Sequence, residues 1–106
     1  MDIHALLAAC EGFQWDKGNS LKSCLKHQVA ESEAEQVFFH EPLLLIIDEK
    51  HSHDETRFRA MGYTDRNRSL YIVFVIRHNL IRVISARDMN KKERAIYEKF
   101  KTDTEI

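Results

Sequence analysis

Four of the arginines on segments that we expect to form β-strands in the second half of the chain are candidates for anion-binding chemistry. Arg57 and Arg59 alternate along residues 56–63, which places both side chains on one face of that strand. Arg82 and Arg87 belong to a later β-prone segment. A guanidinium group stays charged and donates paired hydrogen bonds that match the oxygens of a phosphate or a carboxylate. These residues therefore predict anion-binding chemistry on the surface of a sheet.

Two of these arginines also have a purely structural interpretation. Arg57 can pair with Glu55 on the same strand face, an ion pair that contributes little when it is exposed. Arg82 can pair internally with Glu93 and so fasten the last helix to the sheet. The sequence alone leaves both interpretations open beside the anion-binding one.

The alternation of side chains along the last strand separates its two arginines. Arg82 shares a face with Leu80, Ile84 and Ala86, whereas Arg87 lies on the opposite face or just beyond the end of the strand. We therefore expect that Arg82 and Arg87 need not act together.

The charge of the chain is balanced overall and strongly divided along its length. Its 106 residues are 43% apolar and 31% charged, which predicts one domain over residues 1–106. The net charge of -1 excludes a uniformly basic nucleic-acid binder and an acidic disordered tail. Residues 1–56 carry a net charge of -7 and residues 57–101 a net charge of +8. The positive half is suited to a polyanion or an acidic partner.

Apolar periodicity, capping residues and turn residues predict the elements that position these side chains. Capping boxes are expected at Ser32–Glu35 and at Asn90–Glu93. The pair His78-Asn79 fits a two-residue hairpin loop, because asparagine tolerates a positive φ. The pattern predicts an α+β fold with helices over 3–11, 16–27, 32–40 and 90–100, strands over 43–47, 56–63, 70–77 and 80–87, and a brief extended segment around 13–15.

Other kinds of chemistry find little support in the residues. His51, His53 and Asp54 suggest a metal site, but without a fourth ligand we expect this loop to be solvated. Cys10 and Cys24 fit no zinc or disulfide spacing and are expected to be small buried residues. The sequence contains no phosphate loop, serine-nucleophile motif or membrane-spanning stretch. We therefore expect no metal, no cofactor, no membrane association and a cytoplasmic protein.

A series of short motifs runs through residues 13–100. Its members are Phe13-Gln14-Trp15-Asp16, Leu25-Lys26-His27, Glu35 to Phe38, His51-Ser52, Glu55-Thr56-Arg57-Phe58, Met61-Gly62, Arg82-Val83-Ile84-Ser85-Ala86-Arg87, Glu93-Arg94 and Tyr97-Glu98. In this order they resemble the BrnT-type toxins, small ribonucleases of bacterial type II toxin–antitoxin modules that share the fold of the RelE/ParE toxins. Gln28 stands where the family usually has a glycine after Lys-His.

The resemblance implies a RelE-like, antiparallel four-stranded sheet with N-terminal helices and a C-terminal helix. It also implies an endoribonuclease that cleaves RNA without a metal and thereby inhibits translation and growth. In such cleavage the ribose 2'-hydroxyl attacks the neighbouring phosphate, so the protein must remove one proton, supply another and neutralise a dianionic phosphorane. The implied partner is a BrnA-type ribbon-helix-helix antitoxin that neutralises the toxin, and DNA is then contacted only through the antitoxin complex.

Roles for single residues follow from their positions in the matching motifs. Arg57, Arg82 and Arg87 are the expected phosphate-binding catalytic residues. The general base stays open among His27, Glu55 and Glu93, and we expect His27 and Glu93 to belong to the catalytic set. His27 equally fits a contact to the last carbonyls of its helix, and Tyr97 equally fits the buried face of an amphipathic helix. The expected RNA-binding residues are Lys26, Arg59, Lys91, Lys92 and Tyr97.

Two other function classes compete with the ribonuclease. A noncatalytic domain of the same fold would use its basic face only to dock an acidic, antitoxin-like partner, and the near-neutral total charge favours it. DNA binding by the domain itself has less support, because the chain has no helix-turn-helix glycine turn and only one basic helix.

Overall fold

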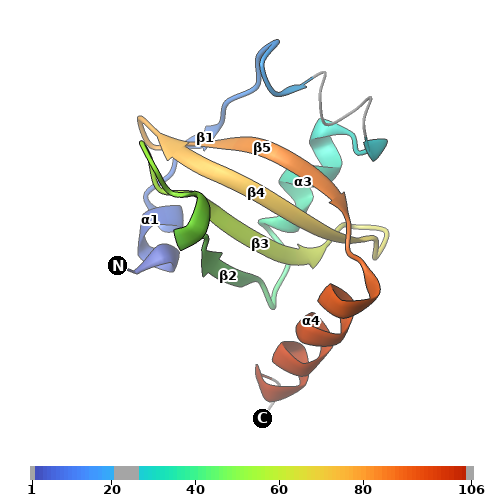
Figure 1. Cartoon of the computed structure of the whole chain (residues 1–106). Helices are drawn as coiled ribbons and strands as arrows, with labels where there is room; N and C mark the ends of the chain where they lie inside the picture. Colours follow the sequence, from blue (N-terminus) through green and yellow to red (C-terminus); the bar gives the residue numbers. More distant parts are fainter. Residues whose placement is uncertain (1, 21–26, 105–106) are drawn as a thin grey trace.

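The computed structural model describes residues 2–20 and 27–104, which form one twisted sheet with helices on both faces (Figure 1). Residues 21–26 of the helix predicted over 16–27 lie outside these residues, and the first helix is shorter than predicted. In chain order the elements are α1 (Ile3–Ala8), β1 (Gly12–Phe13), α3 (Glu31–Val37), β2 (Leu44–Ile47), the 3-10 turn η1 (Glu49–His51), β3 (Phe58–Tyr63), β4 (Ser69–Arg77), β5 (Leu80–Asp88) and α4 (Lys91–Thr104).

Over the described residues the sheet has five strands, in the order β1-β5-β4-β3-β2. The four predicted strands are β2 to β5, and they pair as antiparallel neighbours. The prediction of a four-stranded antiparallel sheet is nevertheless wrong, because β1 adds a fifth strand that runs parallel to β5. Gly12 and Phe13 of β1 pair with Leu80 and Ile81. The fold is therefore α+β with a mixed sheet.

The two faces of the sheet are covered to different extents. One face packs against α3, with α1 at its rim, and forms the main core of Ala34, Val37, Phe58, Ala60, Ile72, Phe74 and Val83, none of them more than 3% exposed. The other face packs against α4 through a smaller cluster of Met61, Met89 and Tyr97. Figure 1 shows α4 extending away from the end of β5, so that much of the second face stays uncovered. We call this second face the open face.

Local signals at two element boundaries are confirmed. His78 and Asn79 form the turn between β4 and β5 with φ values of 53° and 61°, as a primed hairpin turn requires. At the start of α4 the N–H of Glu93 donates to the side chain of Asn90 (2.8 Å), and the N–H of Asn90 donates to the Glu93 carboxylate (3.0 Å). This is the predicted capping box.

The capping box predicted at Ser32–Glu35 is wrong. The N-cap of α3 is Ala30, and its N–H donates to the carboxylate of Glu33 at 3.0 Å. Glu35 instead accepts a 2.7 Å hydrogen bond from the indole N–H of Trp15. The Glu35 side chain, which the predicted capping box would use, is therefore engaged in a tertiary hydrogen bond with Trp15.

An irregularity interrupts the pairing of β4 with β5. Val73 pairs with Ser85, whereas the next residue, Phe74, pairs with Val83. Ile84 is therefore an extra residue in β5, which makes a β-bulge. The alternation of side chains along β5 is reversed beyond this point.

The bulge brings Arg82 and Arg87 to the same face of the sheet. Val83 and Ala86, the residues next to them, are both 0% exposed in the main core. Arg82 and Arg87 therefore lie on the open face. The prediction that Arg87 lies on the opposite face from Arg82, or just beyond the end of the strand, is wrong on both alternatives. It assumed an unbroken alternation along the strand, and β5 extends past Arg87 to Asp88.

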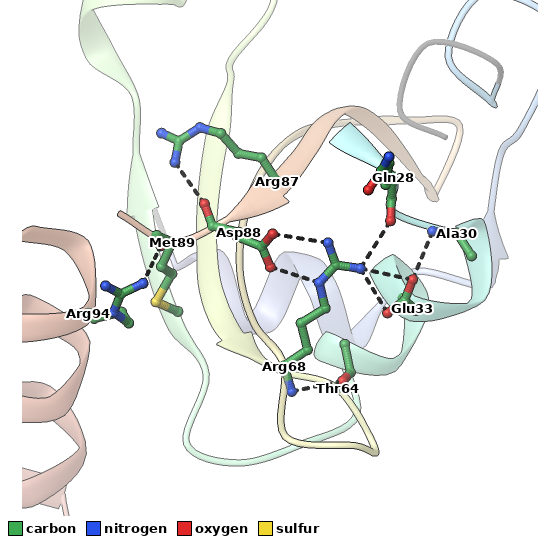
Figure 2. A network of polar contacts seen from close by, with 9 residues as sticks. All are labelled: Gln28, Ala30, Glu33, Thr64, Arg68, Arg87, Asp88, Met89 and Arg94. Atoms are coloured by element: carbon green, nitrogen blue, oxygen red, sulfur yellow. Dashed lines mark hydrogen bonds and ion pairs between the residues drawn. The ribbon is translucent and has the colours of Figure 1, made fainter. Parts of the chain in front are cut away.

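Arg68 joins three separate parts of the fold (Figure 2). From the loop between β3 and β4, its guanidinium donates to both carboxylate oxygens of Asp88 at the end of β5 (2.7 and 3.1 Å). It also donates to the Glu33 carboxylate of α3 (3.1 and 3.2 Å) and to the carbonyl oxygen of Gln28 (3.0 Å). This network fastens α3 to the strand end from which α4 departs.

Gln28 has a φ of 54°, in the left-handed region that favours glycine. We expect Gln28→Gly to raise the free energy of unfolding by about 0.5–1 kcal/mol, because glycine adopts this φ without steric cost. Urea denaturation measures the change. Ser32→Gly, at an exposed helical position of α3, is the control and should lower stability instead. Equal losses in both variants would contradict this interpretation of Gln28.

Candidate functional site

A cleft of about 420 Å³ opens on the open face, where the loop after β2 approaches the centre of the sheet. Positive side chains dominate it, since Lys50, Arg57 and Arg59 line it together with a single carboxylate. The lining residues are Asp48, Lys50, His51, Arg57, Arg59, Tyr71, Val73, Ile84 and Ser85. The cleft therefore combines cations, an imidazole and hydroxyl groups, which is the chemistry needed to bind and transform a phosphate ester.

Asp48 is the buried centre of this cleft, with 5% of its surface exposed. Its carboxylate accepts hydrogen bonds from Nη2 of Arg59 (3.1 Å) and faces Nδ1 of His51 (3.0 and 3.2 Å). Burial raises the pKa of Asp48, but the hydrogen bonds from Arg59 and His51 outweigh burial and hold this pKa below its usual value. Asp48 is therefore an ionised acceptor that orients both neighbours.

The local fold explains why Asp48 and His51 meet. They lie three residues apart across η1, and side chains at this spacing eclipse one another on a 3-10 turn. The hydroxyl of Ser52 donates to the Asp48 carbonyl (2.6 Å) and accepts from the N–H of Arg57 (2.9 Å). These bonds tie the turn to the start of β3 and fix the imidazole at the cleft.

Arg57 is the guanidinium of the cleft that has no internal carboxylate within residues 2–20 and 27–104. The pairing with Glu55 that was considered from the sequence is wrong. Glu55 pairs instead with Arg77 at the end of β4 (Nε to Oε2, 2.9 Å, with a second contact from Nη2). The Arg77 hydrogen bonds lower the pKa of Glu55, so this carboxylate stays ionised and engaged. The Arg57 guanidinium is therefore available to bind an anionic ligand.

Arg82 lies on the open face but is engaged at the edge of the sheet. Its guanidinium donates to Asp16 (2.7 and 2.9 Å) and to Oε1 of Gln14 (3.3 Å). The Arg82 hydrogen bond is the largest cause that lowers the pKa of Asp16 to about 2. The pairing with Glu93 considered from the sequence is therefore wrong. Arg82 fastens the segment after β1 to β5 and does not line the cleft.

Arg87 and Glu93 form a paired unit beside the cleft. Arg87 donates to both oxygens of Glu93 (2.7 and 2.9 Å), and its guanidinium lies 4.3 Å from the ring centroid of Tyr71. The hydrogen bond from Arg87 is the largest cause that lowers the pKa of Glu93. An ionised carboxylate that also caps α4 is a weak proton acceptor, so this geometry suits Glu93 to holding Arg87 in place.

The remaining predicted site residues lie apart from the cleft. His27 is half-buried and does not line it, and Lys26 lies outside the described residues. Lys91 and Lys92 are exposed in the first turn of α4. Tyr97 is 2% exposed and donates to the Pro42 carbonyl (2.6 Å), so it belongs to the packing of α4. Burial raises the pKa of Tyr97 to about 12.

Sequence reasoning missed Asp48, Lys50 and His51 as members of the cleft. His51 was considered only with His53 and Asp54 as a metal site, and those two neighbours are exposed. In the described part of the chain, no group of three or more His, Cys, Asp or Glu side chains could hold a metal ion. The signal that could have found them is the D-x-x-H spacing of Asp48 and His51, which precedes a predicted strand that carries Arg57 and Arg59.

Among the described residues, no helix combines the length and the apolar character needed to cross a membrane.

Comparisons with known proteins place the chain in a family. A search of curated proteins found no match. Residues 15–93 match the family model of the ribonuclease toxin BrnT of type II toxin–antitoxin systems. Because this match spans most of the chain, and includes the cleft and both paired arginines of β5, the chain belongs to the BrnT family of ribonuclease toxins.

Proposed function

We propose that this ribonuclease toxin cleaves RNA in the cleft of the open face without a metal ion, by attack of a ribose 2'-hydroxyl on the adjacent phosphate. The observation that supports this most is the pairing state of Arg57, whose guanidinium lines the cleft and has no internal carboxylate in the described residues. A guanidinium that donates two hydrogen bonds to the phosphorane oxygens stabilises the second negative charge that builds up there. Lys50 supplies a further cation for a flanking phosphate.

The roles of the other predicted residues follow in this proposal. Arg87, held by Glu93 over Tyr71, borders the cleft and contacts the RNA backbone. Arg59 positions Asp48, and Arg82 adds positive potential from the edge of the sheet. Lys91 and Lys92 extend the cationic surface along α4.

An assay with the purified chain tests the mechanism. RNA incubated in excess EDTA should be cut to fragments with 2',3'-cyclic phosphate and 5'-hydroxyl ends, and a 2'-deoxy substitution at the scissile nucleotide should block cleavage. Induction in cells should arrest growth. Cleavage that occurs only with an added divalent ion, or that survives the 2'-deoxy substitution, would contradict this mechanism.

We propose further that the neutralising partner is a BrnA-type ribbon-helix-helix antitoxin and that DNA is contacted only through their complex. The motif resemblance and the family match support this partner. The antiparallel order of β2 to β5 accords with the proposed relationship to RelE/ParE toxins. Co-expression of a ribbon-helix-helix protein encoded by the adjacent reading frame should restore growth, and failure of that protein to bind the chain would contradict the proposal.

A noncatalytic interaction domain is the second candidate, and one observation favours it. Three of the four arginines expected to bind phosphate are already paired: Arg59 with Asp48, Arg82 with Asp16 and Arg87 with Glu93. A face whose arginines are mostly paired with the chain's own carboxylates suits docking of a partner as well as catalysis. Under this alternative the chain binds its antitoxin and leaves RNA uncut at any concentration.

A further inference from the structure

The cleft contains an imidazole whose orientation is fixed by a buried carboxylate. The side chain of Asp48 is 7% exposed, whereas that of His51 is 55% exposed. The carboxylate therefore sits behind the ring and the ring faces solvent on its other side. Arg59 holds the same carboxylate from β3 at 3.1 Å, so the acceptor is anchored by a strand of the sheet.

This geometry determines which ring nitrogen carries a proton. Both oxygens of Asp48 lie within 3.2 Å of Nδ1, and an ionised carboxylate is only an acceptor. Nδ1 therefore donates, and in the neutral ring the lone pair is on Nε2, away from Asp48. A fixed tautomer with an open Nε2 is the arrangement that a general base requires.

We propose that His51, oriented by Asp48, is the general base that takes the proton from the attacking ribose 2'-hydroxyl. This assignment rests on the proposed ribonuclease function. Nε2 accepts the hydroxyl proton while the 2'-oxygen forms its bond to phosphorus, and the bond from phosphorus to the 5'-oxygen breaks. The leaving 5'-oxygen takes a proton from solvent, and the imidazolium then returns its own proton to solvent.

The other candidate bases are less suited to this step. Glu55 and Glu93 are each bound by an arginine, and hydrogen bonds from Arg77 and Arg87 lower their pKa values. Neither carboxylate lines the cleft, and neither does His27. His51 lies in the same cleft as Arg57, so proton removal and phosphate binding converge at one place.

The test compares His51→Ala with His53→Ala in the full chain. His53 is exposed two residues away and makes no hydrogen bond in the described residues, so its replacement should leave the rate unchanged. His51→Ala should lower kcat by about 10²- to 10⁴-fold with little change in KM. Added free imidazole should restore part of the lost rate in His51→Ala and none in Arg57→Ala, because only a missing base can be replaced from solution.

A readout independent of catalysis examines the tautomer. Nitrogen-15 NMR of the intact chain should show His51 protonated at Nδ1 in its neutral form, and Asp48→Asn should alter that tautomer balance. Ring protonation at Nε2 would overturn the assignment, as would full activity of folded His51→Ala or a loss that imidazole does not restore. If the wild-type chain still cleaves RNA in these cases, only the assignment of His51 fails and the proposed ribonuclease function holds. A folded wild-type chain that never cuts RNA overturns both.

Discussion

Replacing Arg57 with alanine is expected to slow RNA cleavage by about 10²- to 10³-fold, the usual cost of removing one donor that stabilises transition-state charge. The loss should appear in kcat more than in KM, because the second phosphorane charge exists only in the transition state. Lys50 and the neighbouring cationic side chains still bind the ground-state RNA backbone. Single-turnover cleavage of a labelled oligonucleotide measures the two constants.

Two further variants make the Arg57 result specific. Arg57→Lys keeps the charge but loses the paired geometry, so its rate should lie between those of wild type and Arg57→Ala. Arg66→Ala removes an exposed arginine in the turn between β3 and β4 that makes no hydrogen bond in the described residues, so it should cleave at the wild-type rate. Equal losses in Arg57→Ala and Arg66→Ala would show that only bulk charge matters, and full activity of folded Arg57→Ala would remove this residue from the mechanism.

The strongly patterned elements of the fold could be predicted from the sequence. The apolar run of β2 and the alternating runs of β4 and β5 are hydrophobic patterns that predict strands. The turn at His78-Asn79 is predicted by a local steric preference, because asparagine tolerates a positive φ. β1 could not be predicted as a strand of the sheet, because two residues have no period. Its pairing depends on the distant start of β5.

The side of the sheet on which Arg87 lies also could not be predicted. Alternation assigns every side chain of a strand from one reference residue, so a single extra residue reverses all later assignments. The extra residue in β5 is Ile84, and an isoleucine, unlike a glycine or a proline, does not mark a bulge in the sequence. An error at one position thus assigned Arg82 and Arg87 to different faces in the prediction, whereas the structure places both on the open face.

The ion-pair partners of the arginines depend on tertiary structure in the same way. Arg82 pairs with a carboxylate that lies 66 residues away in sequence, and no local pattern selects it. Arg87 pairs with Glu93 only six residues away, but across the connection between β5 and α4. The pair of Asp48 and His51 is the local one, and its i to i+3 spacing is visible in the sequence. Only the structure shows that this turn faces Arg57.

Replacing Arg68 with methionine is expected to lower the free energy of unfolding at neutral pH by about 2 kcal/mol. Methionine keeps the apolar stem but leaves Glu33 and Asp88 facing each other without the guanidinium between them (Figure 2). The estimate stays below the cost for a fully buried pair, because the side chain of Asp88 is 61% exposed and solvent screens it. Urea denaturation measures the change, with Arg66→Met from the same turn as the matched control.

Acid should reduce this difference between wild type and Arg68→Met. The hydrogen bond from Arg68 lowers the pKa of Asp88 below its ordinary 3.8, and hydrogen bonds from Ala30 and Arg68 lower that of Glu33 below its ordinary 4.5. A carboxylate with a lowered pKa in the folded state stabilises above its unfolded pKa and loses that contribution as pH falls through the folded value. The two unfolding curves should therefore differ fully above about pH 5 and converge as the pH falls below 3.8, through the lowered folded-state pKa values. A difference that stays constant over this range would show that the guanidinium acts through packing and not through the two carboxylates.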